Sequence, residues 1–244
     1  MRGLISTTLA AILLSAAFGA AAFDIKGGPE WQKRNGFGMG AGFSGIHCMR
    51  DFCEDTMETR FGGSIGGYIG GVYRFMPNLS MYFDFTAGLI NTDLEARDLG
   101  GDDVDKDRGL FMAMIVGAAF HVPITGWLDA YMGFGLGYVY TGFWAEVEPG
   151  GNANERDWYF SFKGLDFQLR TGAHVYLFSN APTFGFGPYM RFDFPLWFTA
   201  CYDIEDVDDH CDWPEDLDDD LGPGWDVDDS PFIFQLGLEL VYGF

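Results

Sequence analysis

The residues best suited to chemistry are carboxylates gathered in a few segments. Residues 201–230, CYDIEDVDDHCDWPEDLDDDLGPGWDVDDS, hold 14 of the 36 Asp and Glu residues of the chain. Clustered carboxylates suit hard divalent cations, so weak cation binding is one interpretation of this segment. A run of charge is more often a solvated segment, and that is the first interpretation.

A second acidic stretch, DVDKDRG at 103–109, looks superficially like a calcium-binding loop. Its glycine, Gly109, comes one position late, and Met114 stands where a bidentate glutamate is required. The sequence therefore predicts no metal site there.

The four cysteines form two local pairs, Cys48 with Cys53 and Cys201 with Cys211. Each pair brackets a single loop, so in an exported protein we predict these two disulfides among the three possible connectivities. A metal site is the alternative, but neither pair has the two-residue spacing of a zinc knuckle.

Export is predicted from residues 1–22, which carry Arg2, a short apolar stretch, and Ala20 and Ala22 placed for cleavage. We interpret this segment as a secretory signal peptide rather than a transmembrane anchor, and residues 23–33 as a short periplasmic segment. No run of 18 apolar residues follows, which argues against a helical membrane protein.

The elements that must position these residues are predicted from a period of two. The segment PFIFQLGLELVYGF places seven apolar residues, from Phe232 to Phe244, on one face. Seven more alternating segments lie at 36–45, 61–75, 79–89, 109–122, 127–140, 165–177 and 184–198. Strands of this length are long for a soluble sheet but match a tilted crossing of a bilayer.

The connections between these strands alternate in length. Short turns such as MPN, PITG and SNAPT alternate with four long polar segments, at 47–60, 91–108, 145–163 and 201–230. The long segments hold 29 of the 36 acidic residues, so the net charge of −22 belongs to one end of the molecule. This pattern predicts an all-β fold, an eight-stranded antiparallel up-and-down barrel with short turns at one end and long acidic loops at the other.

Periodicity alone fits a soluble lipocalin-like barrel equally well, but the composition of the second face favours a membrane barrel. That face is mostly Gly with single Tyr residues and single charges, as a narrow lumen requires. We expect its charged residues to form a closed network, because an unpaired buried charge is costly; a gated hydrophilic path is the alternative. They are Arg74, Asp84, Asp166, Arg170, Arg191, Asp193 and Glu239.

Over residues 34–244 the chain resembles the small eight-stranded outer-membrane proteins of Gram-negative-type bacteria, the family of the outer membrane protein A transmembrane domain and its OmpX-like relatives with protruding loops. The most specific mark is the alternation of Leu240, Tyr242 and Phe244 in the C-terminal strand. The resemblance implies that this strand is the signal read by the barrel assembly machinery. It also implies a monomer in outer-membrane lipid and lipopolysaccharide, with extracellular loops that could meet divalent cations or surface partners.

Two stretches, WAEVE and DWYFSF, are predicted to extend the strands on either side of 145–163 beyond the bilayer. Trp158, Phe160 and Phe162 are out of phase with Leu165, which indicates a bulge near Gly164. A protruding sheet with an open edge would be a docking site for a partner strand.

The sequence contains only fragments of the catalytic motifs known from membrane-barrel enzymes. Lipid deacylases built on membrane barrels use Ser, His and an acid, but no Ser lies two residues from His121 or His174 on the same face. Omptin-type proteases use an Asp-x-His pair, which Asp208 and His210 match by spacing alone.

The sequence therefore predicts a structural or surface-adhesion barrel with a closed lumen, no cofactor and no enzymatic activity. A narrow channel for small solutes or apolar ligands is the alternative, and an omptin-like or lipid-modifying membrane enzyme is third. The strong negative charge excludes a nucleic-acid partner.

Overall fold

The computed structural model describes residues 35–49, 64–90, 103–148, 156–177, 183–204, 208–213 and 232–243. The predicted signal peptide at 1–22, the segment at 23–33, and Phe244 lie outside these residues. The strands are β1 (Gly36–Met49), β2 (Ile65–Met76), β3 (Leu79–Ile90), β4 (Asp103–Thr125), β5 (Leu128–Glu148), β6 (Arg156–Tyr176), β7 (Thr183–Ile204), β8 (Asp208–Asp212) and β9 (Phe232–Gly243). Within these ranges no helix is long and apolar enough to cross a membrane.

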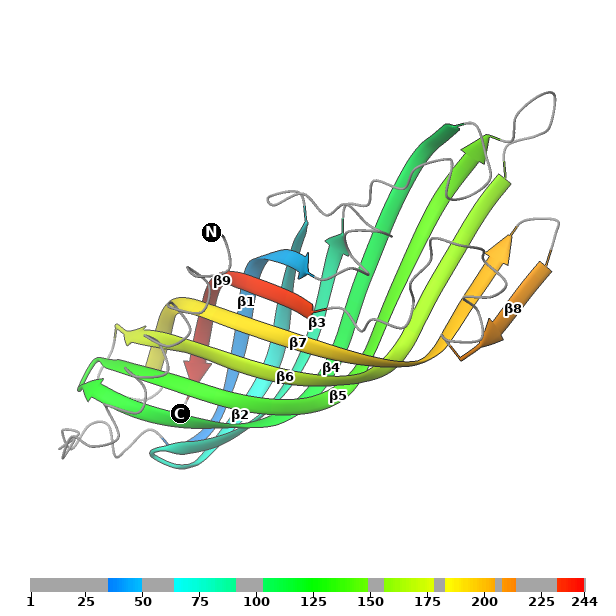
Figure 1. Cartoon of the computed structure of the whole chain (residues 1–244). Coiled ribbons are helices and arrows are strands. Elements are labelled where there is room, and N and C mark those ends of the chain that lie inside the picture. Colours follow the sequence, from blue (N-terminus) through cyan, green and yellow to red (C-terminus); the bar gives the residue numbers. More distant parts are fainter. Residues whose placement is uncertain are drawn as a thin grey trace, which may run out of the picture.

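Eight of the nine strands form a closed antiparallel ring (Figure 1). Strands β1 to β7 pair in chain order, and β9 closes the ring by pairing with β1 on one side and β7 on the other. The short β8 pairs with β7 outside the ring. The predicted eight-stranded up-and-down barrel is therefore confirmed, with β8 as an added hairpin strand.

The apolar face of every ring strand points away from the lumen. Phe134 is 64% exposed and Leu238 is 68% exposed, whereas Arg74 and Asp193 in the lumen are fully buried. A continuous apolar surface of this kind is stable in an apolar solvent, not in water. The predicted orientation is thus confirmed, and the soluble lipocalin-like alternative, with its apolar face inward, is wrong.

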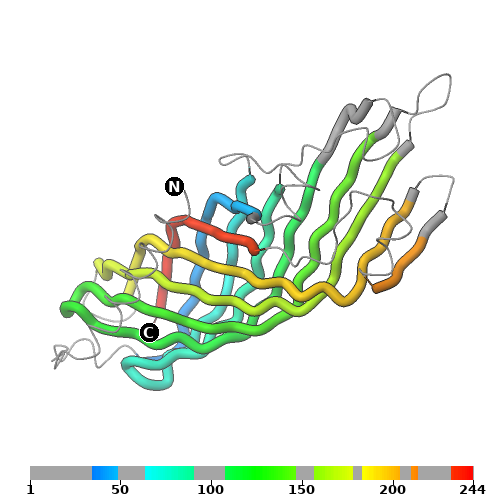
Figure 2. Tube along the Cα trace, in the orientation of Figure 1, coloured from blue at the N-terminus to red at the C-terminus, as the bar shows by residue number. Residues whose placement is uncertain are grey.

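Four strands are much longer than predicted. Strands β4 to β7 have 21 to 23 residues, against 12 to 14 in β1, β2, β3 and β9. Their extra residues form a slanted sheet that continues past the ends of β2 and β3, with β8 at its side (Figures 1 and 2). The extension that WAEVE and DWYFSF indicated is present.

The interpretation of the long segments as loops is therefore wrong for 103–108, 201–204 and 208–212, where the sequence predicted no strand. The ladder continues from Asp103 opposite Glu148 to Trp158 opposite Ile204. Above the bilayer both faces of a sheet can meet water, so these strands need no alternating apolar residues. Their polar sequence therefore resembles that of a solvated loop.

The register shift predicted near Gly164 is present, but the extra residue lies on β7. Lys163 pairs with Thr199 and Gly164 pairs with Trp197, which leaves Phe198 unpaired as a bulge. Strand β6 itself stays in phase, so Phe160 turns into the barrel, where it is buried. Phe160 and Phe162 therefore fill the interior.

The lipid-facing orientation can be tested at Leu136, which points outward from β5. We expect Leu136→Arg to lower the free energy of unfolding by about 2–4 kcal/mol, because a guanidinium would enter the hydrocarbon. Urea unfolding in phospholipid vesicles measures this change. Trp213→Arg, which places the same charge just beyond β8, is the control and should have little effect; equal effects of the two would contradict the orientation.

Candidate functional site

The lumen is divided into an apolar layer toward the long segments and a polar layer toward the short turns. The main side chains of the apolar layer are Ile46, Ile90, Phe111, Ile115, Phe143, Phe160, Phe162 and Ile233. The buried charged and amide side chains are Arg74, Asp84, His121, Asp129, Asp166, Gln168, Arg170, His174, Arg191, Asp193, Gln235 and Glu239. An interior filled with side chains in this way is typical of a narrow eight-stranded barrel.

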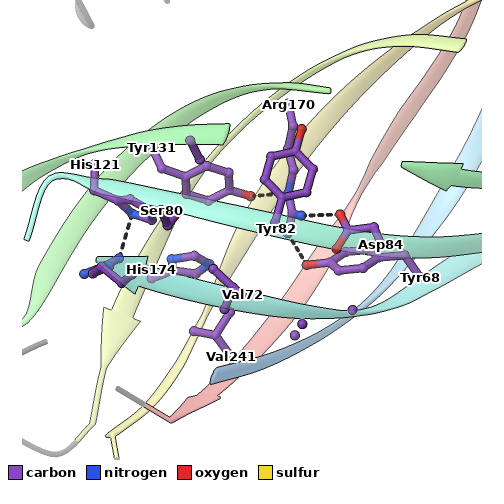
Figure 3. Close-up of a pocket in the computed structure, with 15 residues that line it drawn as sticks. Tyr68, Val72, Ser80, Tyr82, Asp84, His121, Tyr131, Arg170, His174 and Val241 are labelled. Carbon is purple, nitrogen blue, oxygen red and sulfur yellow. Dashed lines mark hydrogen bonds and ion pairs between the residues drawn. The ribbon is translucent and has the colours of Figure 1, made fainter. Parts of the chain in front are cut away.

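Arg170 on β6 is the centre of the polar layer (Figure 3). Its Nη1 donates to Asp84 Oδ2 at 2.6 Å, and its Nη2 contacts Glu239 Oε2 and the Tyr68 hydroxyl. Its Nε donates to the Tyr131 hydroxyl at 3.1 Å, and its guanidinium carbon lies 4.4 Å from the centre of the Tyr68 ring. One side chain thereby joins β2, β3, β5, β6 and β9.

A second group lies nearer the short turns. Arg74 Nη2 donates to Asp129 Oδ2 at 3.2 Å and to His121 Nδ1 at 2.7 Å. His174 connects this group to the centre, with Nε2 at 2.7 Å from Glu239 Oε1 and Nδ1 at 3.5 Å from Asp129 Oδ1. The network therefore runs without a break from β2 to β9.

A third group lies nearer the apolar layer. Arg191 Nε donates to Asp193 Oδ1 at 2.7 Å, and Arg191 Nη1 also contacts the Thr86 hydroxyl. Gln235 donates to Asp193 Oδ2 at 2.9 Å. With its amide oriented to satisfy both atoms, Gln168 accepts from Arg191 Nη2 at 2.7 Å. Both oxygens of Asp193 are thus hydrogen-bonded.

Of the seven charges assigned to the lumen from the sequence, six are in these ion pairs. Asp166 is the exception, since it accepts from the backbone N–H of Phe194 at 3.0 Å and forms no ion pair with a described residue. Sequence reasoning left out three members, His121, Asp129 and His174. Each has the inward parity of its strand, so the alternation could have found them.

Ser80 and His121 form part of an arrangement that resembles a catalytic triad. Ser80 Oγ lies 2.9 Å from His121 Nε2, and Asp129 Oδ2 lies 3.8 Å from His121 Nδ1. Spacing along a single strand could not reveal this contact, because the two residues come from neighbouring strands β3 and β4.

The hydrogen bond from Arg74 prevents His121 from acting as a general base toward Ser80. A guanidinium only donates, so His121 Nδ1 must accept from Arg74 and the ring proton must lie on Nε2. His121 then donates to Ser80 Oγ instead of withdrawing its proton, which is the opposite of nucleophile activation. The contact is a structural hydrogen bond.

A cavity of about 40 Å³ lies in the polar layer beside Tyr68, Ser80, His121 and Arg170. This volume accommodates a few water molecules and no larger solute. The cavity therefore leaves room for ordered water between these polar side chains.

The remaining predicted site residues lie outside the network. Cys201 and Cys211 form a disulfide that joins β7 to β8. Cys48 is disulfide-bonded, and Cys53 lies outside the described residues. Leu240 and Tyr242 point outward, and their role as an assembly signal stays a prediction.

The acidic segments provide no metal site in the part of the chain that the structure describes, where no group of three candidate ligands occurs. His210 is exposed and lies 3.7 Å from Asp212 Oδ2. The side chain of Asp208 is outside the described set.

A closed eight-stranded ring with an apolar outer belt and a filled polar lumen is the fold of the small outer-membrane β-barrel proteins. No protein-family model and no curated protein matches the sequence. Among solved structures, the chain is similar to a major outer membrane protein from Thermus thermophilus, with 14% identity, 86% of this chain and 100% of that chain covered, and a TM-score of 0.56. That likeness shows the shared fold.

Two further solved structures have lower TM-scores. Neisserial surface protein A has 10% identity, with 85% of this chain and 97% of that chain covered and a TM-score of 0.48. Ail, the attachment invasion locus protein of Yersinia pestis, has 12% identity, with 86% and 99% covered and a TM-score of 0.46.

The role of Arg170 can be tested by removing its charge. We expect Arg170→Met to lower the free energy of unfolding by about 3–5 kcal/mol, because Asp84 and Glu239 would stay buried without their cation. Urea unfolding of the barrel in vesicles measures the change. The triple variant Arg170→Met, Asp84→Asn, Glu239→Gln should recover more than half of the loss; a triple variant less stable than the single one would contradict this account.

Proposed function

We propose that the protein is an integral outer-membrane barrel whose lumen is a structural plug and whose protruding sheet makes contacts at the cell surface. The observation that carries this proposal is the asymmetry of the ring, because strands β4 to β7 extend well beyond the rest. A closed barrel needs no such extension to remain in a membrane. The extension is therefore the part available for another task.

The interior supports a structural role for the lumen. The ion pairs around Arg170 are buried, and a passage would have to separate them. Separating a buried pair without replacing its partners costs several kcal/mol. Together with the apolar layer above, this cost favours a permanent plug over a channel for small solutes or apolar ligands.

The extended sheet supports a surface role. The last pair between β3 and β4 is Ile90 with Gly109, and β4 continues from there to Asp103 with no described strand on that side. An exposed strand edge offers a row of backbone donors and acceptors to an extended partner. We propose that the extended sheet faces outward from the cell, in keeping with the short turns at the opposite end.

Membrane insertion is tested by gel mobility of the detergent-extracted outer-membrane fraction. We expect an unboiled sample to migrate differently from a boiled one, because a closed barrel resists detergent until it is heated. A protein found in the soluble periplasmic fraction, with no mobility shift, would overturn the proposal.

The surface role is tested by shortening the β5–β6 hairpin. Replacing residues 146–157 with an Asn-Gly turn joins Ala145 to Trp158, which are register partners, and keeps the apolar layer. We expect the heat-dependent shift to persist while attachment of expressing cells to a matrix-coated surface falls to the level of cells without the protein. Asp212→Asn, which removes one charge from the same sheet, is the matched control; undiminished attachment of the shortened variant would remove the adhesion role.

A further inference from the structure

A groove of about 640 Å³ lies along strands β3 to β6 where the extended sheet begins, and outward-facing side chains form most of its lining. Leu89, which is 58% exposed, and Trp144, which is 41% exposed, point outward into it, while their strand neighbours Ile90 and Phe143 are buried inside the barrel. The lining residues are Leu89, Arg108, Gly109, Leu110, Trp144, Ala145, Glu146, Asp157, Trp158 and Tyr159.

The groove crosses the boundary between the apolar belt and the charged extension. Leu89 and Leu110 are register partners at its lower end. The next row across the sheet is Arg108, Trp144 and Tyr159, whose two aromatic rings lie 5.4 Å apart. Trp and Tyr concentrate where hydrocarbon meets headgroups, so this row marks the interface.

Above this row stand Glu146 and Asp157, which are register partners on β5 and β6. The lining thus changes from leucine through aromatic residues to charge within a few residues. An occupant that matches it must itself be amphipathic, with an apolar part below and a polar part above.

The groove lining holds one cationic side chain, Arg108, beside the carboxylates of Glu146 and Asp157. Arg108 is exposed and forms no ion pair with any described residue, whereas Glu146 and Asp157 each interact with another group. Arg108 lies beside the exposed ring of Trp144 and the half-buried ring of Tyr159. A guanidinium suits a phosphate, which it can bind with two parallel hydrogen bonds.

We propose that this groove binds a membrane lipid with a phosphate-bearing headgroup, with the phosphate on Arg108 and an acyl chain on Leu89 and Leu110. The inference rests on the proposed placement of the barrel in the outer membrane. It adds a defined lipid site at the base of the extended sheet, where a bound headgroup would hold the sheet at a fixed height above the bilayer.

Lipid binding to the folded, detergent-solubilised protein can be measured by native mass spectrometry. The probes are phosphatidic acid and phosphatidylcholine with the same acyl chains, with inorganic phosphate as a competitor. We expect phosphatidic acid to bind about tenfold more tightly than phosphatidylcholine, and Arg108→Gln to remove that preference.

Lys163→Gln is the matched control, because Lys163 is opposite Tyr140 on the same sheet, is outside the groove lining and forms no ion pair with a described residue. It should keep the preference, and Arg108→Lys should keep part of it. A retained heat-dependent gel shift shows that each variant is folded.

Equal affinity for the two lipids, equal loss in Arg108→Gln and Lys163→Gln, or displacement of phosphatidic acid by an equal concentration of inorganic phosphate would each overturn the lipid site. Displacement would indicate a bare anion site instead. These outcomes concern the folded barrel in detergent, so they are distinct from failure of the proposed function, which would appear as absence from the outer-membrane fraction or undiminished attachment of the shortened variant.

Discussion

The structure depends on the closure of the ring by β9. This strand pairs with β1 from Gly38 to Met49 and with β7 from Thr183 to Asp193, so none of the eight ring strands has a free edge within the apolar belt. In hydrocarbon every unpaired backbone N–H or C=O costs several kcal/mol, and a closed barrel is the one arrangement of strands that leaves none. Closure then determines which face of each strand meets the lipid and which faces the lumen, and it sets the volume of the interior.

That fixed volume explains the pairing of glycine with large polar side chains. A Cβ on Gly42 would overlap the Tyr68 ring, and one on Gly70 would overlap Asp84 Oδ1. The glycines make room for the side chains that satisfy the charges around Arg170. Since those charges have no access to bulk water, each must find its partner inside, and the lumen becomes a continuous network instead of a set of isolated pairs.

The sequence predicted the parts of this structure that follow from strand parity. Residues such as Arg74 and Glu239 alternate with lipid-facing neighbours, so their inward direction could be known in advance. Their partners could not, because contacts across the lumen depend on the tilt and stagger of the strands. The hydrogen bond from His121 to Ser80, and the place of Asp129 beside Arg74, belong to this second kind.

The extended sheet was predicted only in part from the sequence, for a different reason. Beyond the bilayer the lipid no longer demands one apolar face, so the segments around Asp103 and Glu148 carry no period that distinguishes a strand from a solvated loop. The bulge at Phe198 was located only approximately, because the pattern shows where the phase changes but not which strand holds the extra residue.

The lipid-facing and the water-facing parts of the sheet meet on the outer face of β4 and β5. Below Leu110 the lipid restricts outward positions to apolar residues, and above Arg108 water permits either kind. A residue at the boundary can contact both an acyl chain and a headgroup, which neither region alone allows. The row of Arg108, Trp144 and Tyr159 is therefore where this barrel can recognise the polar part of a lipid while the ring below it remains a fixed scaffold. Because β3 ends at Ile90 while β4 continues to Asp103, the groove lies where the described ladder between these two strands ends.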